Sequence, residues 1–415
     1  MIWLKNIFKK YRYVLLILLL SSLVIFYRYG QIPQNLSFDE VEFAKLALSL
    51  ENKPYTPYSS MATGHSTLYF YIILLSFKIF GISKLALRLP AAVFGVLSPA
   101  IFYLILKNVF SQTVKKEGFL PFLFSLLFLS SRWYVNFARF SFEATFLLFL
   151  ELSAIYFLFQ CIKTSKRSDL VLTGIFTGLA FNSYTPGRIF FIMIAIFAIA
   201  KIHKKDIKKL LYFFVPFIAV ILPLSFYLLT NRDTRFDQQF FLKNEQLSIE
   251  KKISFLEGNI KADMLMFGFE GDINGRHNYP GKPALNPIIN GFFVLGLIIS
   301  LIKIKNFNNR FFLCYFILSL IPSILTYPWE NPNMLRTFTV LPSVIYLVGT
   351  GILFLLSYVQ KIKLTKTALP IIIFMVTVSS VYEIRTYFKY QRTVFDQAFE
   401  VKKNLGELLK INHTK

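Results

Sequence analysis

The sequence predicts an all-α protein that crosses a membrane many times and carries further helices along the external membrane surface. Its 415 residues are 55% hydrophobic, above the roughly 45–50% of an average soluble domain. Long uncharged runs recur along the chain, and the Lys and Arg that give a formal net charge of +24 cluster between them. The cytoplasmic side of a bilayer explains cations placed in this way. The composition therefore argues for a lipid bilayer as partner and against nucleic-acid binding.

Apolar segments predict eleven membrane-spanning helices. A basic N-terminus precedes the first, and no small-residue cleavage site follows it, so this span is expected to be retained. The positive-inside rule then makes the N-terminus cytoplasmic and the C-terminus external. The predicted spans are residues 13–29, 89–107, 119–136, 144–162, 169–184, 189–202, 210–230, 288–304, 311–327, 338–359 and 368–384.

The apolar segment 68–80 is predicted to lie along the external membrane surface. It is shorter than the ~20 residues that a spanning helix needs, and Lys78 interrupts it. If it crossed the membrane, the loop with Lys115 and Lys116 and every later basic loop would lie outside, against the positive-inside rule. Residues 30–88 are therefore predicted to form one long external loop with two membrane-parallel helices.

One transmembrane catalytic domain in the cell membrane is predicted over residues 1–384. A second long external loop is expected at 231–287. Residues 385–415 are expected to form a short external amphipathic tail, because apolar residues recur there at helical spacing. No internal repeat or low-complexity linker divides the chain.

Arg132 and Glu151 are two charged residues within the predicted spans that need an explanation. Arg132, near the outer end of the third span, is expected to snorkel to the surface beside Trp133. Glu151 lies inside the fourth span, where it must be protonated or paired. A bond to a neighbouring polar residue such as Asn182 is preferred for Glu151 over a role with substrate.

Asp39 and Glu40 are the candidate catalytic carboxylates. They stand just beyond the first span, at the head of a short amphipathic helix, and a carboxylate held at a membrane surface suits proton abstraction from a hydroxyl. The alternative is an acidic helix cap, with Ser37 as the N-cap and Glu40 three residues later.

The other polar candidates also fall in the predicted external loops. An external arginine at a helix end is often only an anchor, but several arginines beside two acidic sites indicate a cleft for an anionic group. Arg139 ranks first because it lies one helical turn before Glu143, which would point both into one cleft if the fourth helix begins that early. The candidates are His65, Asn136, Arg139, Glu143, Arg188, Arg276, His277, Asn278 and Arg336.

The sequence shows no spacing typical of a metal site. Its histidines, His65, His203, His277 and His413, are scattered, and its two cysteines lie in or beside apolar runs, which gives disulfides no support. No cofactor is expected to be required, and a divalent metal is left open.

The Asp39-Glu40 pair after the first span resembles the catalytic loop of the GT-C membrane glycosyltransferases. The similarity is to the branch of the protein O-mannosyltransferases, including bacterial dolichyl-phosphate-mannose-protein mannosyltransferases, and the lipid A aminoarabinose transferase. Residues 80–83 (Phe-Gly-Ile-Ser) and 86–90 (Ala-Leu-Arg-Leu-Pro) are similar to a signature of that branch. Ser66-Thr67 depart from it by replacing a Pro-Pro pair. Further similar segments are 64–71, 138–144, 276–281, and Arg336 with 341–342.

The resemblance implies an inverting glycosyltransferase with its site on the external or periplasmic face. The donor would be a sugar on a polyprenyl phosphate, and the acceptor a hydroxyl of a glycan, lipid or protein in the cell envelope. Asp39 would be the base, supported by Glu40, with Glu143 as the other catalytic carboxylate. Arg139, Arg276, His65, Arg188 and Arg336 would bind the donor phosphate, and Asn136, His277 and Asn278 the sugar or acceptor.

Two other functions remain as alternatives. A flippase for polyprenyl-linked saccharides would carry charged residues along a midplane path and internal repeats. A lipid-linked glycan polymerase or ligase would work through arginines in a large external loop and would not need Asp39. The polar residues gather at one predicted face, which favours the transferase.

Overall fold

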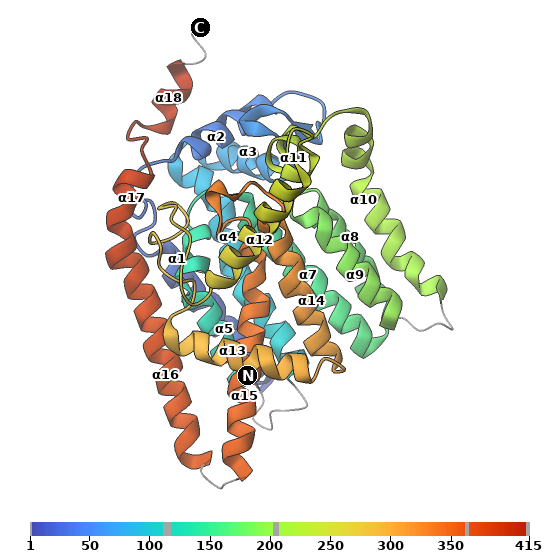
Figure 1. The fold of residues 1–415 in the computed structure, drawn as a ribbon, viewed down its shortest axis with the longest axis vertical. Helices are drawn as coiled ribbons and strands as arrows, with labels where there is room; N and C mark the ends of the chain where they lie inside the picture. The colour runs from blue at the N-terminus through green and yellow to red at the C-terminus, as the bar shows by residue number, and fades with distance from the viewer. Residues whose placement is uncertain (1, 111–117, 202–206, 362–364, 412–415) are drawn as a thin grey trace.

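The computed structural model describes residues 2–110, 118–201, 207–361 and 365–411, in which helices joined by loops and one short β-hairpin form the secondary structure (Figure 1). The predicted all-α class is confirmed. Lys115, Lys116, His203 and His413 lie outside the described residues.

Long apolar helices form the body of the molecule. In the described part of the chain, six helices are long and apolar enough to cross a membrane, and shorter apolar helices accompany them. The exact number of spans and their orientation stay predictions. The helices that correspond to predicted spans are α1 (Ile2–Phe26), α4 (Lys84–Val109), α5 (Phe119–Ser130) with α6 (Arg132–Phe137), α7 (Glu143–Thr164), α8 (Arg167–Phe181), α9 (Gly187–Lys201), α10 (Leu211–Thr230), α13 (Pro287–Ile302), α14 (Phe307–Ile324), α15 (Leu341–Lys361) and α16 (Thr365–Arg385).

Short elements gather at one end of this body (Figure 1). Three of them, α2, α3 and α11, come from the two segments predicted as long external loops. The short elements of these loops are α2 (Phe38–Ser49), β1 (Tyr58–Ser59), β2 (His65–Ser66), α3 (Leu68–Phe80), α11 (Thr234–Gln239) and α12 (Ile249–Leu265).

Helix α3 has the bounds expected from its sequence, Leu68 to Phe80. At 1.5 Å per residue it is about 20 Å long, less than the ~30 Å of a bilayer core. The third predicted span differs from the expectation, because it breaks at Ser131 into α5 and α6. Ser131 has an extended ψ of 124°, which ends one helix before the next begins.

Arg132, directly after this break, does not snorkel. The side chain is buried, and its Nη1 lies 2.7 Å from Glu383 Oε2 of α16. It also donates to the carbonyl oxygen of Lys282 at 3.2 Å and to that of Pro283. The expectation of a surface anchor was wrong because a partner from α16, distant in sequence, compensates the charge inside the protein.

Glu151 also has a different partner from the expected one. The Tyr315 hydroxyl of α14 donates to Glu151 Oε2 at 2.6 Å, whereas Asn182 donates to the carbonyl of Val220. Glu151 therefore joins α7 to α14 within the helix body.

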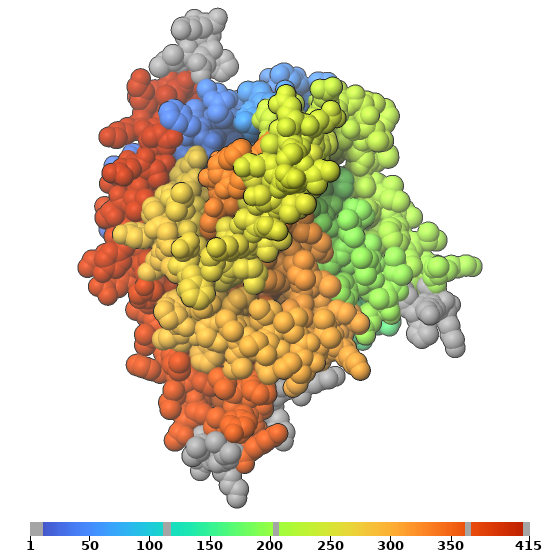
Figure 2. Space-filling model, viewed as in Figure 1, coloured from blue at the N-terminus to red at the C-terminus, as the bar shows by residue number. Residues whose placement is uncertain are grey.

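Helix α12, in yellow, crosses one face of the molecule (Figure 2), and it packs against α14. Its Asn259 and Asp263 are buried against α14, while Ile249, Ile253 and Ile260 stay exposed. The charged segment between α10 and α13 is thus built onto the helix body.

The C-terminal segment continues α16 through a π-helical turn, Thr386–Gln391, into α17 (Arg392–Ala398). Val401 then forms an antiparallel bridge with Leu36, and α18 (Leu405–Ile411) follows. The segment predicted as a tail therefore touches the residues that lead into α2.

Candidate active site

A polar cavity of about 310 Å³ lies among the short elements. Residues from seven separate parts of the sequence line it, and most carry charge or can hydrogen-bond. Its charged and imidazole groups are Asp39, Glu42, His65, Arg235, Arg276, His277, Glu330 and Arg336.

Asp39 faces this cavity from the first turn of α2. Ser37 and Glu40 form a reciprocal capping box that starts the helix, so the position of Asp39 is fixed by its neighbours. Its carboxylate is 45% exposed, and Oδ2 lies 2.5 Å from Arg276 Nη1. Asp39 can therefore meet a molecule in the cavity while it is paired with a cation.

Glu40 has the alternative role, that of a cap. It is fully buried, and Arg88 of α4 binds it with two bonds, at 2.7 Å and 2.8 Å. The backbone N–H of Ser141 donates to the same carboxylate at 3.0 Å. Glu40 thus fixes α2 to α4 and to the segment before α7, and it does not line the cavity.

Glu143 and His65 form a buried pair at one wall of the cavity. Glu143 is the first residue of α7, and its Oε1 lies 2.5 Å from His65 Nδ1. His65 Nε2 lies 2.8 Å from the carbonyl oxygen of Ala62. Glu143 Oε2 is buried without a hydrogen-bond partner among the described residues. His65 lines the cavity, and Glu143 stands behind it.

Arg235, which sequence reasoning missed, is brought to the same wall by α11. Its Nη1 lies 2.8 Å from His65 Nε2 and 3.9 Å from Glu143 Oε1. Burial alone would lower the pKa of Arg235, but Tyr184, Glu143 and Asp39 outweigh it and raise the pKa above the ordinary value. The guanidinium therefore stays charged. Charged residues crowded directly after an apolar span, at 232, 233 and 235, were the available signal.

Arg188 supports Arg235 from outside the cavity. It pairs with Asp233 and donates to Ser66 Oγ at 3.3 Å. Asp233 is the N-cap of α11, the helix that carries Arg235. Burial alone would raise the pKa of Asp233, but Arg188 outweighs it, so the pKa is lowered.

Arg276 and His277 enter the cavity on a loop that Asp272 holds. Asp272 Oδ2 lies 2.9 Å from His277 Nδ1 and accepts from the N–H of Met334 at 2.8 Å. The N–H of Asn274 donates to the other oxygen of Asp272 at 2.7 Å. Asp272 was not singled out from the sequence, and it fixes the orientation of both cavity residues.

Two further candidates position this loop and do not line the cavity. Asn136 donates to the carbonyls of Arg276 and His277 at 2.7 Å and 3.1 Å. Asn278 is buried and donates to the carbonyls of Asp272 and Lys282 at 3.0 Å and 2.7 Å.

Arg139 lies away from the cavity. Helix α7 begins at Glu143, so Arg139 is not one turn earlier on the same helix. Its guanidinium is fully buried and donates to backbone carbonyls at and after the end of α1. These carbonyls belong to Val24, Ile25, Arg28 and Ile32.

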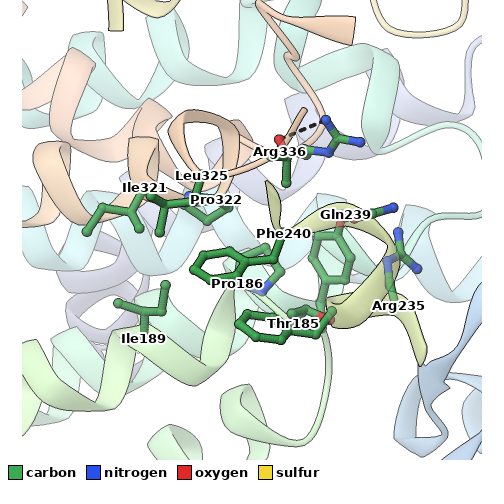
Figure 3. Close-up of a pocket in the computed structure, with 13 residues that line it drawn as sticks. Thr185, Pro186, Ile189, Arg235, Gln239, Phe240, Ile321, Pro322, Leu325 and Arg336 are labelled. Carbon is green, nitrogen blue, oxygen red and sulfur yellow. Dashed lines mark hydrogen bonds between the residues drawn. The ribbon is translucent and has the colours of Figure 1, made fainter. Parts of the chain in front are cut away.

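An apolar groove adjoins the cavity between α9, α11 and α14 (Figure 3). Arg336 stands at its edge, donating to Thr326 Oγ1 at 3.0 Å and pairing with Glu330 at 2.7 Å. The apolar residues of the groove include Pro186, Ile189, Phe240, Pro322 and Leu325. Tyr184, Arg235, Gln239 and Arg336 line both the groove and the cavity.

The part of the chain that the structure describes contains no cluster of three or more His, Cys, Asp or Glu side chains suited to a metal ion. The arrangement offers instead an accessible carboxylate, several arginines and two histidines. Such a set can take a proton and bind an anionic group.

Comparison with solved structures shows the same fold. The oligosaccharyltransferase of Archaeoglobus fulgidus aligns with a TM-score of 0.52 and 14% identity, over 95% of this chain and 56% of that one. ArnT of Cupriavidus metallidurans, solved bound to undecaprenyl phosphate, aligns with a TM-score of 0.52 and 8% identity, over 94% of this chain and 77% of that one. The chain thus spans about half the length of the first and three quarters of the second.

The chain therefore has the same fold as these two proteins. Residues 64–228 match the model of the family described as dolichyl-phosphate-mannose-protein mannosyltransferase, and this match confirms the resemblance seen in the sequence. A search of the curated proteins found no significant match.

Proposed function

We propose that the chain is an inverting membrane glycosyltransferase that moves a sugar from a polyprenyl phosphate to an acceptor hydroxyl. The observation that carries this proposal is the junction of the polar cavity with the apolar groove, where Arg235 and Arg336 line both. A polyprenyl-phosphate sugar has a polar head, an anionic centre and an apolar chain. The cavity, the two arginines and the groove offer matching environments in that order.

In the proposed reaction Asp39 takes the proton of the acceptor hydroxyl while its oxygen attacks C1 of the sugar. The bond between C1 and the phosphate oxygen breaks, and the leaving polyprenyl phosphate keeps the electron pair. Because this is a single displacement, the anomeric centre is inverted. Arg235, Arg276 and Arg336 stabilise the charge that grows on the phosphate.

Arg276 links binding to chemistry in this scheme. It holds Asp39 in the structure described here, and a donor phosphate offers it a second anionic partner. When Arg276 turns to the phosphate, the carboxylate of Asp39 is released to accept a proton. His65 and His277 would contact the phosphate or the sugar from the cavity wall.

The acceptor is proposed to be a hydroxyl of a glycan, lipid or protein, and the reaction to take place on the external face of a cell membrane. The carboxylates of Asp39, Glu42 and Glu330 line the cavity. These carboxylates can hydrogen-bond hydroxyl groups, which suits any of the three acceptor classes.

The contacts of the helix body speak against a flippase. Such a carrier would need charged groups available along a path through the membrane. Arg132 is instead paired with Glu383, and Glu151 is bonded to Tyr315.

The test is to incubate membranes containing the protein with a panel of labelled polyprenyl-phosphate sugars and follow transfer of the label. We expect transfer from at least one donor, with release of polyprenyl phosphate. Glu257→Gln, an exposed change on α12, serves as a control that retains activity. No transfer from any donor, together with polymerisation of a lipid-linked oligosaccharide that survives Asp39→Asn, would overturn the proposal in favour of a polymerase or ligase.

A further inference from the structure

Asp263 of α12 is a buried carboxylate outside the cavity. It is 1% exposed, and its Oδ1 lies 2.9 Å from the Ser323 hydroxyl of α14. Its Oδ2 is buried without a hydrogen-bond partner among the described residues. An ionised carboxylate with one oxygen left unsolvated is costly in such a place.

The hydrogen bonds around Ser323 contain one acceptor too many for an ionised Asp263. Ser323 Oγ lies within bonding distance of two acceptor oxygens, Asp263 Oδ1 at 2.9 Å and Asn331 Oδ1 at 3.0 Å. The amide of Asn331 is oriented by its Nδ2, which donates to the Ser323 carbonyl at 2.9 Å. A serine hydroxyl has a single proton. Both contacts are hydrogen bonds only if Asp263 is protonated and donates to Ser323, which then donates to Asn331.

The electrostatic surroundings agree with this proton count. Burial raises the pKa of Asp263 from its ordinary value of 3.8 to about 7, although Ser323 and Arg336 act in the opposite direction. Both of the neighbouring cations have other partners. Arg336 is paired with Glu330, and Lys252 of α12 donates to the carbonyl of Leu242.

Asn331 belongs to a segment that reaches the cavity. We call residues 328–336 the cavity loop. Glu330, Asn333, Leu335 and Arg336 of this loop line the cavity, and Arg336 also lines the groove. Asn333 folds the loop by accepting from the N–H groups of Leu335 and Arg336 at 3.1 Å and 3.0 Å.

A second contact from α12 holds the other side of Arg336. Asn259, one turn before Asp263, donates to the carbonyls of Ile324 and Thr326 at 2.8 Å and 2.7 Å. Thr326 accepts from Arg336 through its hydroxyl. Helix α12 therefore fixes the two segments between which Arg336 is held.

We propose that Asp263 is a positioning residue for Arg336. Protonated Asp263 donates to Ser323, and Ser323 donates to Asn331. These two hydrogen bonds, which we call the latch, hold the cavity loop closed and keep Arg336 between the cavity and the groove. Loss of this proton removes the bond to Asn331, so the loop opens as the pH rises past neutral. The latch acts on transfer through Arg336, and in that respect it rests on the function proposed above.

The latch can be tested without any sugar donor. Hydrogen–deuterium exchange of residues 326–336, corrected for the intrinsic dependence of exchange on pH, measures opening of the loop. For a closed state with the raised pKa and an open state with the ordinary one, opening should increase about tenfold in wild type from about pH 6 to about pH 8. Asp263→Asn keeps a donor for Ser323 and cannot titrate, so its exchange should not change with pH. Glu257→Gln, also on α12, should behave as wild type.

Ser323→Ala provides a second measurement if Asp263→Asn does not fold. It removes the relay, so the cavity loop should exchange rapidly at both pH values. Wild-type exchange that is the same at both pH values, or a pH dependence that survives in Asp263→Asn, would overturn the latch. Failure to find sugar transfer would instead count against the proposed function alone, because exchange is measured without donor or acceptor.

Discussion

Asp39 and Arg276 are 237 positions apart in the sequence, and their side chains meet in an ion pair of 2.5 Å. Both remain partly exposed to the cavity, at 45% and 29%. A pair at this level of exposure can be broken by a competing anion, since water compensates each charge when the partner leaves. The candidate base and a candidate phosphate ligand are therefore coupled before any substrate binds.

Replacing Asp39 by Asn should reduce sugar transfer by roughly 10²–10⁴-fold. The amide keeps the shape of the side chain but cannot take the proton of the acceptor. Turnover and the thermal midpoint should be measured together, and the midpoint should stay close to wild type because Glu40, not Asp39, anchors α2. Near-normal turnover would move the base elsewhere, with Glu143 as the next carboxylate to test.

Arg235→Lys should lower turnover by at least about tenfold more than it lowers donor affinity. A planar guanidinium can bind two phosphate oxygens, whereas an ammonium is a point charge, and the difference grows as the leaving phosphate gains charge. Arg232→Lys, in the same segment but outside the cavity, is the matched control. Equal losses in affinity and turnover would show that Arg235 contributes to binding without favouring the transition state.

Filling the groove should weaken the binding of donors that carry a long apolar chain. Ile189→Trp places a large ring where the groove runs past α9, while Ile192→Trp changes a residue on the exposed side of the same helix. We expect affinity for a polyprenyl-phosphate sugar to fall in the first variant only. A donor analogue with a very short chain should bind both variants and wild type alike. If Ile189→Trp binds the long donor normally, the chain occupies another surface.

Arg139→Lys should destabilise the protein without a specific effect on catalysis. Lysine cannot satisfy all of the carbonyls that Arg139 binds at the end of α1, and each buried group left without a partner costs about 1–3 kcal/mol. The thermal midpoint should fall, whereas the exposed substitution Arg310→Lys should leave it unchanged. A loss of turnover at full stability would return Arg139 to the list of phosphate ligands.

The ion pair of Asp233 with Arg188 predicts a loss of donor binding in acid. The pKa of Asp233 is lowered in the folded protein from its ordinary value of 3.8, so its contribution to stability is complete above that value. That contribution is lost only as the pH falls through the depressed value. Asp233→Asn should reproduce the acid state at neutral pH, and the affinity for donor should drop as α11 and Arg235 lose their anchor. An unaltered donor affinity in this variant would show that the anchoring of α11 by Asp233 does not contribute to donor binding.

The features that were predicted correctly from the sequence depend on neighbours in the chain. The bounds of α3 follow from its apolar run, and the cap of α2 follows from Ser37 and Glu40 three residues apart. A short stretch of sequence contains all the information for such features.

The features that were missed depend on partners far along the chain. The residues next to Arg132 do not predict its pairing with Glu383. The residues next to Arg139 do not predict its bonds to the carbonyls at the end of α1. The sequence shows that a charged residue lies beside a span. The pairing of distant helices decides whether that residue is a surface anchor, a substrate ligand or a buried cation bonded to another helix. Arg235 was overlooked for the same reason, because only the folded chain brings it to His65.

The bridge between Leu36 and Val401 has a practical consequence for anyone who shortens or labels this protein. Phe399, two residues before the bridge, packs against Phe140 at 5.5 Å between ring centroids and lies under the Arg88 guanidinium at 5.8 Å. Cutting the chain after residue 385 would therefore uncover the clasp between Arg88 and Glu40 and loosen the helix that presents Asp39. The described residues from 386 to 411 therefore support the helix that presents Asp39 and are not a dispensable appendage.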